Sequence, residues 1–280
     1  MTGMHRYALA ACVALTASCA VSARAQALPE RIAKTQVIRV SVNAIYPPLE
    51  FKDPASGQLI GFDIDLGEAL AKELGVSFEW QESAYEQLFP ALATGRADMI
   101  LSGINDSPVR RESVDFIDYL TTSAQFYALA PRADLTSADA LCGKTVGTSR
   151  ASSFPPKVKA WSDEHCVAAG KPPITIEGTT DNAIARAELK QARFDAAVQG
   201  NETLPYIMSL EPHTYRLVGT PFAGLYQGIA FRKDGGQLRG AVLAAFKALI
   251  ANGTYAKIVA RWHLQADAVS QAAINGEAVR

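Results

Sequence analysis

The stretch "GFDIDLGEALAKELGVSFEW", from Gly61 to Trp80, contains an amphipathic pattern that is followed at once by a short apolar run. We expect a helix over 63–75, with Asp63 as its cap and Gly75 at its end. The run 76–80 is rich in β-branched and aromatic residues, which indicates a strand. A helix that leads directly into a strand is the repeating unit of α/β proteins.

The same alternation continues on both sides of this stretch and predicts two α/β lobes with largely parallel sheets. Open α/β sheets bind ligands at the carboxyl ends of their strands, so a cleft between the lobes is the expected ligand position. Strands are expected at 37–42, 97–101, 144–149, 174–178, 194–200, 215–219 and 226–233, and helices at 85–95, 154–170, 182–191, 202–210, 238–251 and 255–262.

Two extended segments rich in small residues, 123–132 and 219–231, flank the second run of strands and helices. We expect both to cross between the lobes, which makes the first lobe discontinuous. Lobe 1 is then formed by residues 37–127 and 222–264, and lobe 2 by residues 128–221. Residues 265–280 lack an apolar face and are expected to form a loose C-terminal tail.

The composition is ordinary for a soluble globular protein, with 280 residues, 49% hydrophobic and 20% charged. The formal net charge is −1, so there is no basic footprint for a nucleic acid partner. No nucleophilic triad, glycine-rich phosphate loop or metal-ligand cluster is evident, and no cofactor is expected.

Residues 1–25 have the order of a secretory signal peptide: a cation, an apolar run and a small-residue cleavage pattern, "ARAQA". Cleavage after Ala25 or Ala27 is expected, and the mature protein is expected in the periplasm. The segment that ends at Cys19 also faintly resembles a lipoprotein cleavage box, although Thr16 fits its first position poorly.

Two cysteines, Cys142 and Cys166, lie outside the signal segment. In an exported, oxidising setting such a pair is most simply a disulfide bond. His165 beside Cys166 would suggest a metal site, but no second pair of ligands stands at a usable spacing.

The stretch "SGINDSPVRR", from Ser102 to Arg111, follows the expected strand 97–101. Ser107 is placed to cap a helix whose first turn holds Pro108, and exposed N–H groups there favour an anion. Arg110 stands in that turn, where a cation opposes the helix dipole unless a carboxylate lies beside it. Arg111 is expected to be a solvated surface charge.

Five segments in register resemble one family. "VSVNAIYPPLEF", "GFDIDLGEALAKELG", "ALATGRADMILSGINDSPVRRESVDFIDY", "LCGKTVG" and "ANGTYAKIVARW" are similar to the periplasmic solute-binding proteins of polar amino acid ABC importers, family 3. The resemblance implies two Rossmann-like lobes joined by a two-strand hinge, a type II periplasmic-binding-protein fold. It also implies a monomer without enzymatic activity that closes on a small carboxylate ligand and delivers it to an ABC permease and ATPase complex in the inner membrane.

The resemblance also implies which residues bind the ligand. Those that hold its carboxylate are Ser102, Gly103, Asn105 and Arg110; Tyr46 and Tyr85 sandwich its side chain; and Arg150, Ala151 and Ser152 form a turn of lobe 2 in which Ser152 donates to the carboxylate. Ala151 stands where the family usually has glycine.

The sequence departs from the family where aspartates usually hold the ligand's ammonium: Asn43 and Gly200 replace them, and Asn201 follows. A buried charge without a partner costs several kcal/mol, roughly, so the ligand or its partner must differ. Either Glu202 or Glu50 supplies the counter-charge, or the ligand has no ammonium and the asparagines read hydroxyl or carbonyl groups. An amino acid or a close derivative is favoured.

Two other functions remain open. Periplasmic dehydratases of cyclohexadienyl acids resemble these binding proteins and need a general acid in the cleft. Glu202 and Glu50 are the candidates for that role. A ligand-sensing partner of a receptor is the other alternative.

Overall fold

Strand β1 (Val37–Val42) begins lobe 1 in the computed structural model, which describes residues 27–279. It pairs in parallel with β5 (Ser77–Glu82) and β6 (Met99–Ile100). The helix α2 (Phe62–Leu74) packs on this sheet through the apolar residues on one side of the helix, and Gly75 ends it in the left-handed conformation with φ 68°. The helix-to-strand unit predicted from the sequence is therefore confirmed.

The predicted cap of that helix is wrong. Gly61 occupies the N-cap position, and Asp63 lies inside the first turn with its side chain fully buried. The carboxylate of Asp63 accepts hydrogen bonds from the backbone N–H of Gly103 and the hydroxyl of Tyr119. It holds the end of a neighbouring strand rather than the end of its own helix.

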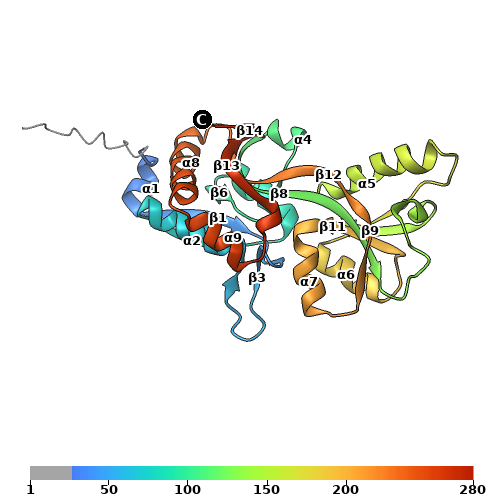
Figure 1. Cartoon of the computed structure of the whole chain (residues 1–280). Coiled ribbons are helices and arrows are strands. Elements are labelled where there is room, and N and C mark those ends of the chain that lie inside the picture. The colour runs from blue at the N-terminus through green and yellow to red at the C-terminus, as the bar shows by residue number, and fades with distance from the viewer. Residues whose placement is uncertain (1–26, 280) are drawn as a thin grey trace, which may run out of the picture.

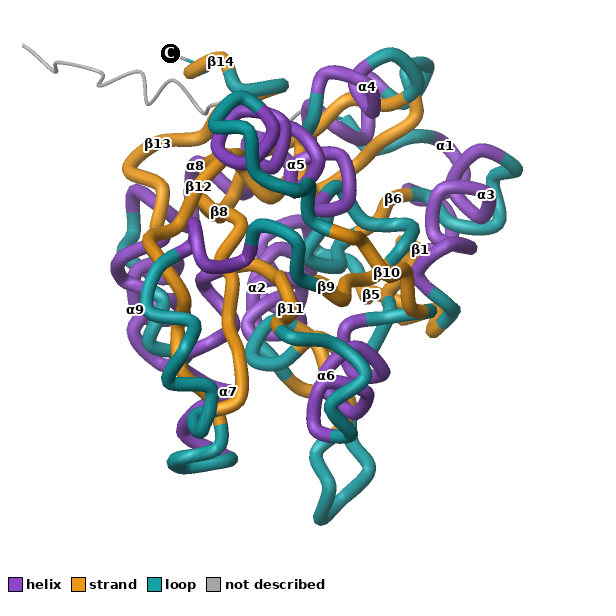
Figure 2. The backbone as a smooth tube through the Cα atoms, turned by 90° about the vertical axis from the view of Figure 1, so that its right-hand side faces the viewer, coloured by secondary structure: helices purple, strands orange, loops and turns teal. Residues whose placement is uncertain are grey.

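Lobe 2 repeats the plan with three strands in the order β10 (Thr175–Thr179), β9 (Thr145–Ser149), β11 (Ala196–Gly200), all parallel. Helix α5 (Phe154–Ser162) covers one face of this sheet, and α6 (Asn182–Lys190) and α7 (Leu204–Leu210) lie on the other (Figures 1 and 2). Each lobe has its own buried apolar core.

Two long strands connect the lobes: β8 (Val114–Leu129) and β12 (Tyr215–Arg232) run antiparallel to each other from one lobe into the other (Figure 1). They join both sheets into one, in the order β10-β9-β11-β8-β12-β6-β1-β5. This is the two-strand hinge of the type II periplasmic-binding-protein fold, so the predicted fold class is confirmed. The residues at which one lobe passes into the other stay a prediction.

The C-terminal segment is not a loose tail, and that prediction is wrong. Residues Ala268–Ile274 form strand β13, which pairs with β8, and β14 (Glu277–Ala278) folds back on it. The side chain of Asn275 accepts a hydrogen bond from the backbone of Phe116. Backbone pairing holds this segment, which is why it needs no apolar face.

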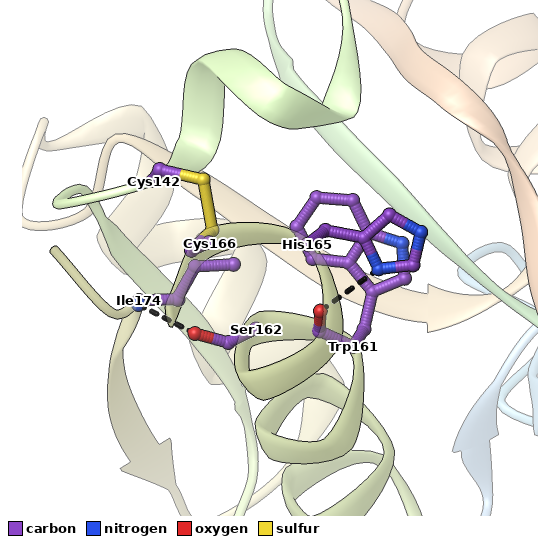
Figure 3. The surroundings of a disulfide bond; sticks show 6 residues. All are labelled: Cys142, Trp161, Ser162, His165, Cys166 and Ile174. Atoms are coloured by element: carbon purple, nitrogen blue, oxygen red, sulfur yellow. Dashed lines mark hydrogen bonds between the residues drawn. A yellow bond between two sulfur atoms is a disulfide. The ribbon is translucent and has the colours of Figure 1, made fainter. Parts of the chain in front are cut away.

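The predicted disulfide bond between Cys142 and Cys166 is present, with 5.4 Å between the Cα atoms (Figure 3). It ties the helical turn Asp163–Val167, which follows α5, to the loop before β9. His165 stacks on Trp161 at 4.4 Å between ring centroids, so its ring is used in packing. Across residues 27–279 no group of three or more metal-ligating side chains occurs.

The predicted signal segment and Cys19 lie outside the described residues. Within residues 27–279, no helix alone has the length and apolar character to cross a membrane, although α8 and α9, bent by 78°, meet that test as a pair. The remaining elements are α1 (Glu30–Thr35), β2 (Ile45–Tyr46), β3 (Glu50–Lys52), β4 (Leu59–Ile60), α3 (Leu88–Ala93), β7 (Asn105–Asp106), α4 (Pro108–Arg111), α8 (Gly236–Ala251) and α9 (Thr254–Arg261).

Candidate functional site

A pocket lies between the lobes, at the carboxyl ends of strands from both sheets, where open α/β sheets bind ligands. Lobe 1 lines it with Asn43, Ile45, Tyr46, Glu50, Tyr85, Ser102, Gly103 and Asn105, and lobe 2 with Ser149, Ser152, Phe154, Asp181 and Asn182. Among the predicted ligand residues, the structure thus brings together Asn43, Tyr46, Tyr85, Ser102, Gly103, Asn105 and Ser152.

The residues that follow strand β6, Ser102 and Gly103, line part of this pocket. The hydroxyl of Ser102 donates to Glu50 at 2.8 Å and accepts from the backbone N–H of Asn43 at 2.9 Å. Gly103 has a φ of 53°, and a Cβ atom there would lie 3.0 Å from the ring of Tyr46. Only a glycine fits this combination of left-handed backbone and close approach.

Arg110 stands beside the pocket in α4. Its guanidinium donates to the carbonyl oxygen of Asn105 at 2.9 Å and to the hydroxyl of Tyr85 at 3.1 Å, and lies 5.0 Å from the ring centre of Phe89. No carboxylate within the described residues pairs with it. An arginine has five N–H donors, so the groups that hold it in place leave part of the fork available to an anion.

Arg111 has the opposite environment, and the prediction that it is a solvated charge is wrong. It forms a two-pronged ion pair with Asp106, at 2.5 Å and 2.8 Å, and the carboxylate of Asp106 is fully buried. Ser107 occupies the N-cap position of α4, but its side chain makes no capping hydrogen bond, so that part of the prediction is also wrong.

Two buried carboxyl groups lie under the pocket. Burial, and then the charge of Asp63, raise the pKa of Glu50 well above its usual value, while burial raises the pKa of Asp63 to about 7. No hydrogen bond within the described residues reaches Oε2 of Glu50 or Oδ1 of Asp63. The raised pKa of Glu50 favours its neutral form.

Glu202 makes a third buried carboxyl, 3% exposed, and it bridges the lobes. It accepts hydrogen bonds from Tyr46 of lobe 1 at 3.2 Å, from Gln227 at 2.9 Å and from Thr122 at 2.5 Å. Burial raises the pKa of Glu202 to about 7. Both oxygens of Glu202 are thus engaged by side chains of the protein.

This carboxyl group also explains Gly200. A Cβ atom at Gly200 would lie 2.1 Å from Oε1 of Glu202, and the backbone N–H of Gly200 donates to the hydroxyl of Tyr46 at 3.2 Å. The space next to residue 200, where the resembling family carries an aspartate side chain, is filled here by Glu202.

Several predicted residues lie outside the pocket lining. Asn201 accepts from the backbone N–H of Ser123 in β8 and donates to Asp267 at 3.0 Å, so its side chain ties the C-terminal segment to the hinge. Arg150 is exposed and donates to Thr180 at 3.0 Å. The residues that do not line the pocket are Arg110, Arg150, Ala151, Gly200 and Asn201.

Sequence reasoning missed two groups in lobe 2. Asp181 and Asn182 line the pocket at the start of α6, and Asp181 caps that helix by accepting from the backbone of Ile184. Their position just after strand β10 was the available signal, since residues after strands face the cleft. Phe154 of α5, which also lines the pocket, was missed as well.

Some buried polar atoms around the cleft have no hydrogen-bond partner. Within the described residues, three residues that line the pocket hold such an atom: Oε2 of Glu50, Nδ2 of Asn105 and Oδ1 of Asn182. Buried polar groups are nearly always hydrogen-bonded in folded proteins. A concentration of exceptions in one cleft is typical of a polar ligand site.

Residues 38–265 match the family of bacterial extracellular solute-binding proteins, family 3. The arginine-binding protein of Corynebacterium glutamicum is 31% identical over 248 residues, which are 89% of this chain and 81% of that protein. Among solved structures, an ancestral arginine-binding protein bound to arginine is similar at a TM-score of 0.73 and 32% identity, covering 81% of this chain and 98% of that one.

A further solved structure bears on the enzyme alternative. It is an ancestral amino acid-binding protein described as a precursor of cyclohexadienyl dehydratase, similar at a TM-score of 0.71 and 31% identity over 83% of this chain and 97% of that one.

Proposed function

The chain belongs to the bacterial extracellular solute-binding proteins of family 3, and we propose from this premise that it captures an amino acid or a close derivative between its lobes. It delivers this ligand to an ABC permease and ATPase complex in the inner membrane. The binding of arginine by similar proteins supports the amino acid class. Closure of the lobes around the ligand is the event that the permease recognises, because the ligand favours the closed state.

The observation that carries this proposal is the environment of Arg110. Its guanidinium is held beside the pocket by Asn105 and Tyr85, which both line the pocket, and it has no carboxylate partner in residues 27–279. An arginine oriented in this way and left without a counter-ion is suited to a ligand carboxylate, which it can grip with two parallel hydrogen bonds.

A thermal-shift screen of the proteinogenic amino acids, opines and small organic acids tests the proposal. A ligand that binds the folded state raises the melting temperature in proportion to the logarithm of its excess over the dissociation constant. We expect a dose-dependent rise with at least one carboxylate-bearing amino acid or derivative. No shift with any member of these classes would overturn the proposed function.

The dehydratase alternative is weaker, because the similar proteins described above are binding proteins. Glu202 does not line the pocket, and its oxygens are engaged by Tyr46, Thr122 and Gln227. Glu50 lines the pocket and burial raises its pKa, so it is the acid that any turnover would implicate. We therefore infer a binding role without catalysis, and turnover of prephenate or arogenate by the purified protein would contradict it.

A further inference from the structure

The start of helix α6 brings two hydrogen-bond acceptors of lobe 2 to the pocket. Asp181 and Asn182, which both line the pocket, occupy the N-cap and the first position of this helix. Oδ1 of Asp181 accepts from the backbone N–H of Ile184 at 2.8 Å, and the hydroxyl of Thr179 donates to the backbone carbonyl oxygen of Asp181 at 2.8 Å. These contacts fix the position of the carboxylate and use only one of its oxygens.

The remaining acceptors of this pair have no partner in the protein. No hydrogen bond or ion pair within residues 27–279 engages Oδ2 of Asp181, and the neighbouring cations Arg150 and Arg186 donate to other side chains. Oδ1 of Asn182 is buried and also lacks a donor, although buried polar atoms are nearly always hydrogen-bonded. Two adjacent side chains therefore lack a group that supplies N–H donors.

Lobe 1 contributes donors to the same pocket. Nδ2 of Asn105 has no partner although the residue is only 4% exposed, and the carbonyl oxygen of Asn105 holds the guanidinium of Arg110 beside the pocket. The acids that line the pocket are Glu50 and Asp181. Burial raises the pKa of Glu50, which favours its neutral form, so Asp181 is the acid of the lining that is suited to balance a cationic group.

The dipole of α6 does not argue against a cation at this position. A helix N-terminus by itself attracts anions, because its first N–H groups have no partner within the helix. Here the carboxylate of Asp181 already supplies a negative charge and engages the N–H of Ile184. The side chains of Asp181 and Asn182 contribute a carboxylate oxygen and an amide oxygen, and both of these accept from N–H groups. This end of the pocket therefore suits a nitrogen group of the ligand.

We propose that Asp181 and Asn182 bind a cationic nitrogen group of the ligand, an ammonium or a guanidinium, while Arg110 binds its carboxylate. Asp181 then supplies the counter-charge that Asn43 and Gly200 do not provide. This inference rests on the proposed function and names the charge that the ligand carries at its second end. A ligand held in this way contacts both lobes, so the same contacts favour the closed state.

The test uses isothermal titration calorimetry with L-arginine and L-citrulline, whose side chains have nearly the same shape but end in a charged guanidinium and a neutral urea group. The substitution Asp181→Asn removes the charge and keeps the helix cap, since asparagine caps helices as well as aspartate does. The affinity for L-arginine should fall by about ten-fold or more, because a hydrogen bond between charged groups is lost. An equal loss for L-citrulline assigns Asp181 to the α-ammonium, which both probes share, and a smaller loss assigns it to the guanidinium.

The matched control is Asp163→Asn, which changes the net charge of lobe 2 by the same amount. Asp163 is 52% exposed and pairs with Lys159 on the surface, so both affinities should stay unchanged. Asn182→Ala should weaken the binding of the same probes by about three-fold or more, since it removes a neutral acceptor.

Unchanged affinity of Asp181→Asn for both probes would overturn the role of Asp181, and the same result for Asn182→Ala would remove Asn182 from the site. Binding of neither probe by the wild type would overturn this inference. The proposed function would fall with it only if the thermal-shift screen also gave no shift with any carboxylate-bearing amino acid or derivative.

Discussion

The two ends of the cleft treat their charged groups in opposite ways. At the cation end, Arg110 is held by a carbonyl oxygen and a hydroxyl and has no carboxylate partner in residues 27–279. At the acid end, Glu202 accepts from Tyr46, Thr122 and Gln227. The guanidinium of Arg110 therefore has no salt-bridge partner within residues 27–279, while the carboxyl of Glu202 holds the two lobes together.

The largest effect is expected from Arg110→Met, which breaks the cation end. A ligand carboxylate would be buried without its partner, at a cost of about 2–5 kcal/mol in binding free energy. Titration calorimetry with a ligand found in the screen measures this loss. The melting temperature of the unliganded protein should change little, because no internal carboxylate depends on Arg110.

Arg111→Met provides the contrast. It leaves the fully buried carboxylate of Asp106 without its cation, which lowers the stability of the protein rather than its contact with the ligand. If Arg110→Met lowered the melting temperature while ligand affinity stayed unchanged, the assignment of the two arginines would be reversed.

These adjacent arginines also show what the sequence can and cannot predict. The strands and helices follow from apolar periodicity, and the family resemblance marks Arg110. That Arg111 reaches back to Asp106 depends on the path of the chain between them, which no periodicity records. In the same way, β13 is held by backbone hydrogen bonds to β8, which leave no apolar pattern in the sequence.

Gly200 and the two lysines of α5 likewise show that side-chain packing cannot be predicted from the sequence. The sequence identifies Gly200 as a departure from the family, but the direction in which the side chain of Glu202 turns decides what fills the space. Lys157 and Lys159 are the same residue type two positions apart in one helix. Only the packing of α5 buries the Nζ atom of the first and leaves the second exposed.

At the acid end, Glu202→Gln should change the dependence of stability on pH. The pKa of Glu202 in the folded protein, about 7, is raised by burial above its value in the unfolded chain. The folded state therefore holds this proton more tightly, and the resulting stability is complete below about pH 4.3 and is lost as the pH rises through 7. The loss amounts to about 4 kcal/mol at most, since one pKa unit corresponds to about 1.4 kcal/mol.

Urea unfolding between pH 4 and 8 measures this difference. Wild type and Glu202→Gln should be similar at the acid limit, and the variant should become relatively more stable as the pH rises, because glutamine has no proton to lose. Asp63 and Asp118, whose pKa values burial also raises to about 7, contribute equally to both proteins and cancel in the comparison. Parallel curves for the two proteins would show that folding does not raise the pKa of Glu202.

The smallest expected effect comes from Gly200→Ala, which tests why a glycine stands at the acid end. The backbone there, with φ −66° and ψ 134°, suits alanine, so strain in the main chain is not the reason. The added methyl group would lie 2.1 Å from Oε1 of Glu202 and must displace a carboxyl that three donors hold. Such overpacking costs about 1–3 kcal/mol.

In a Glu202→Ala background the same substitution should cost almost nothing, because the methyl group then enters space that the carboxyl has vacated. The difference between the two costs is the coupling energy of a double-mutant cycle, measured by urea unfolding of the four proteins. Strictly additive effects would mean that the glycine does not accommodate Glu202. Coupling of the expected sign would mean that the family's aspartate and this buried glutamate exclude each other, because one space cannot hold both carboxyl groups.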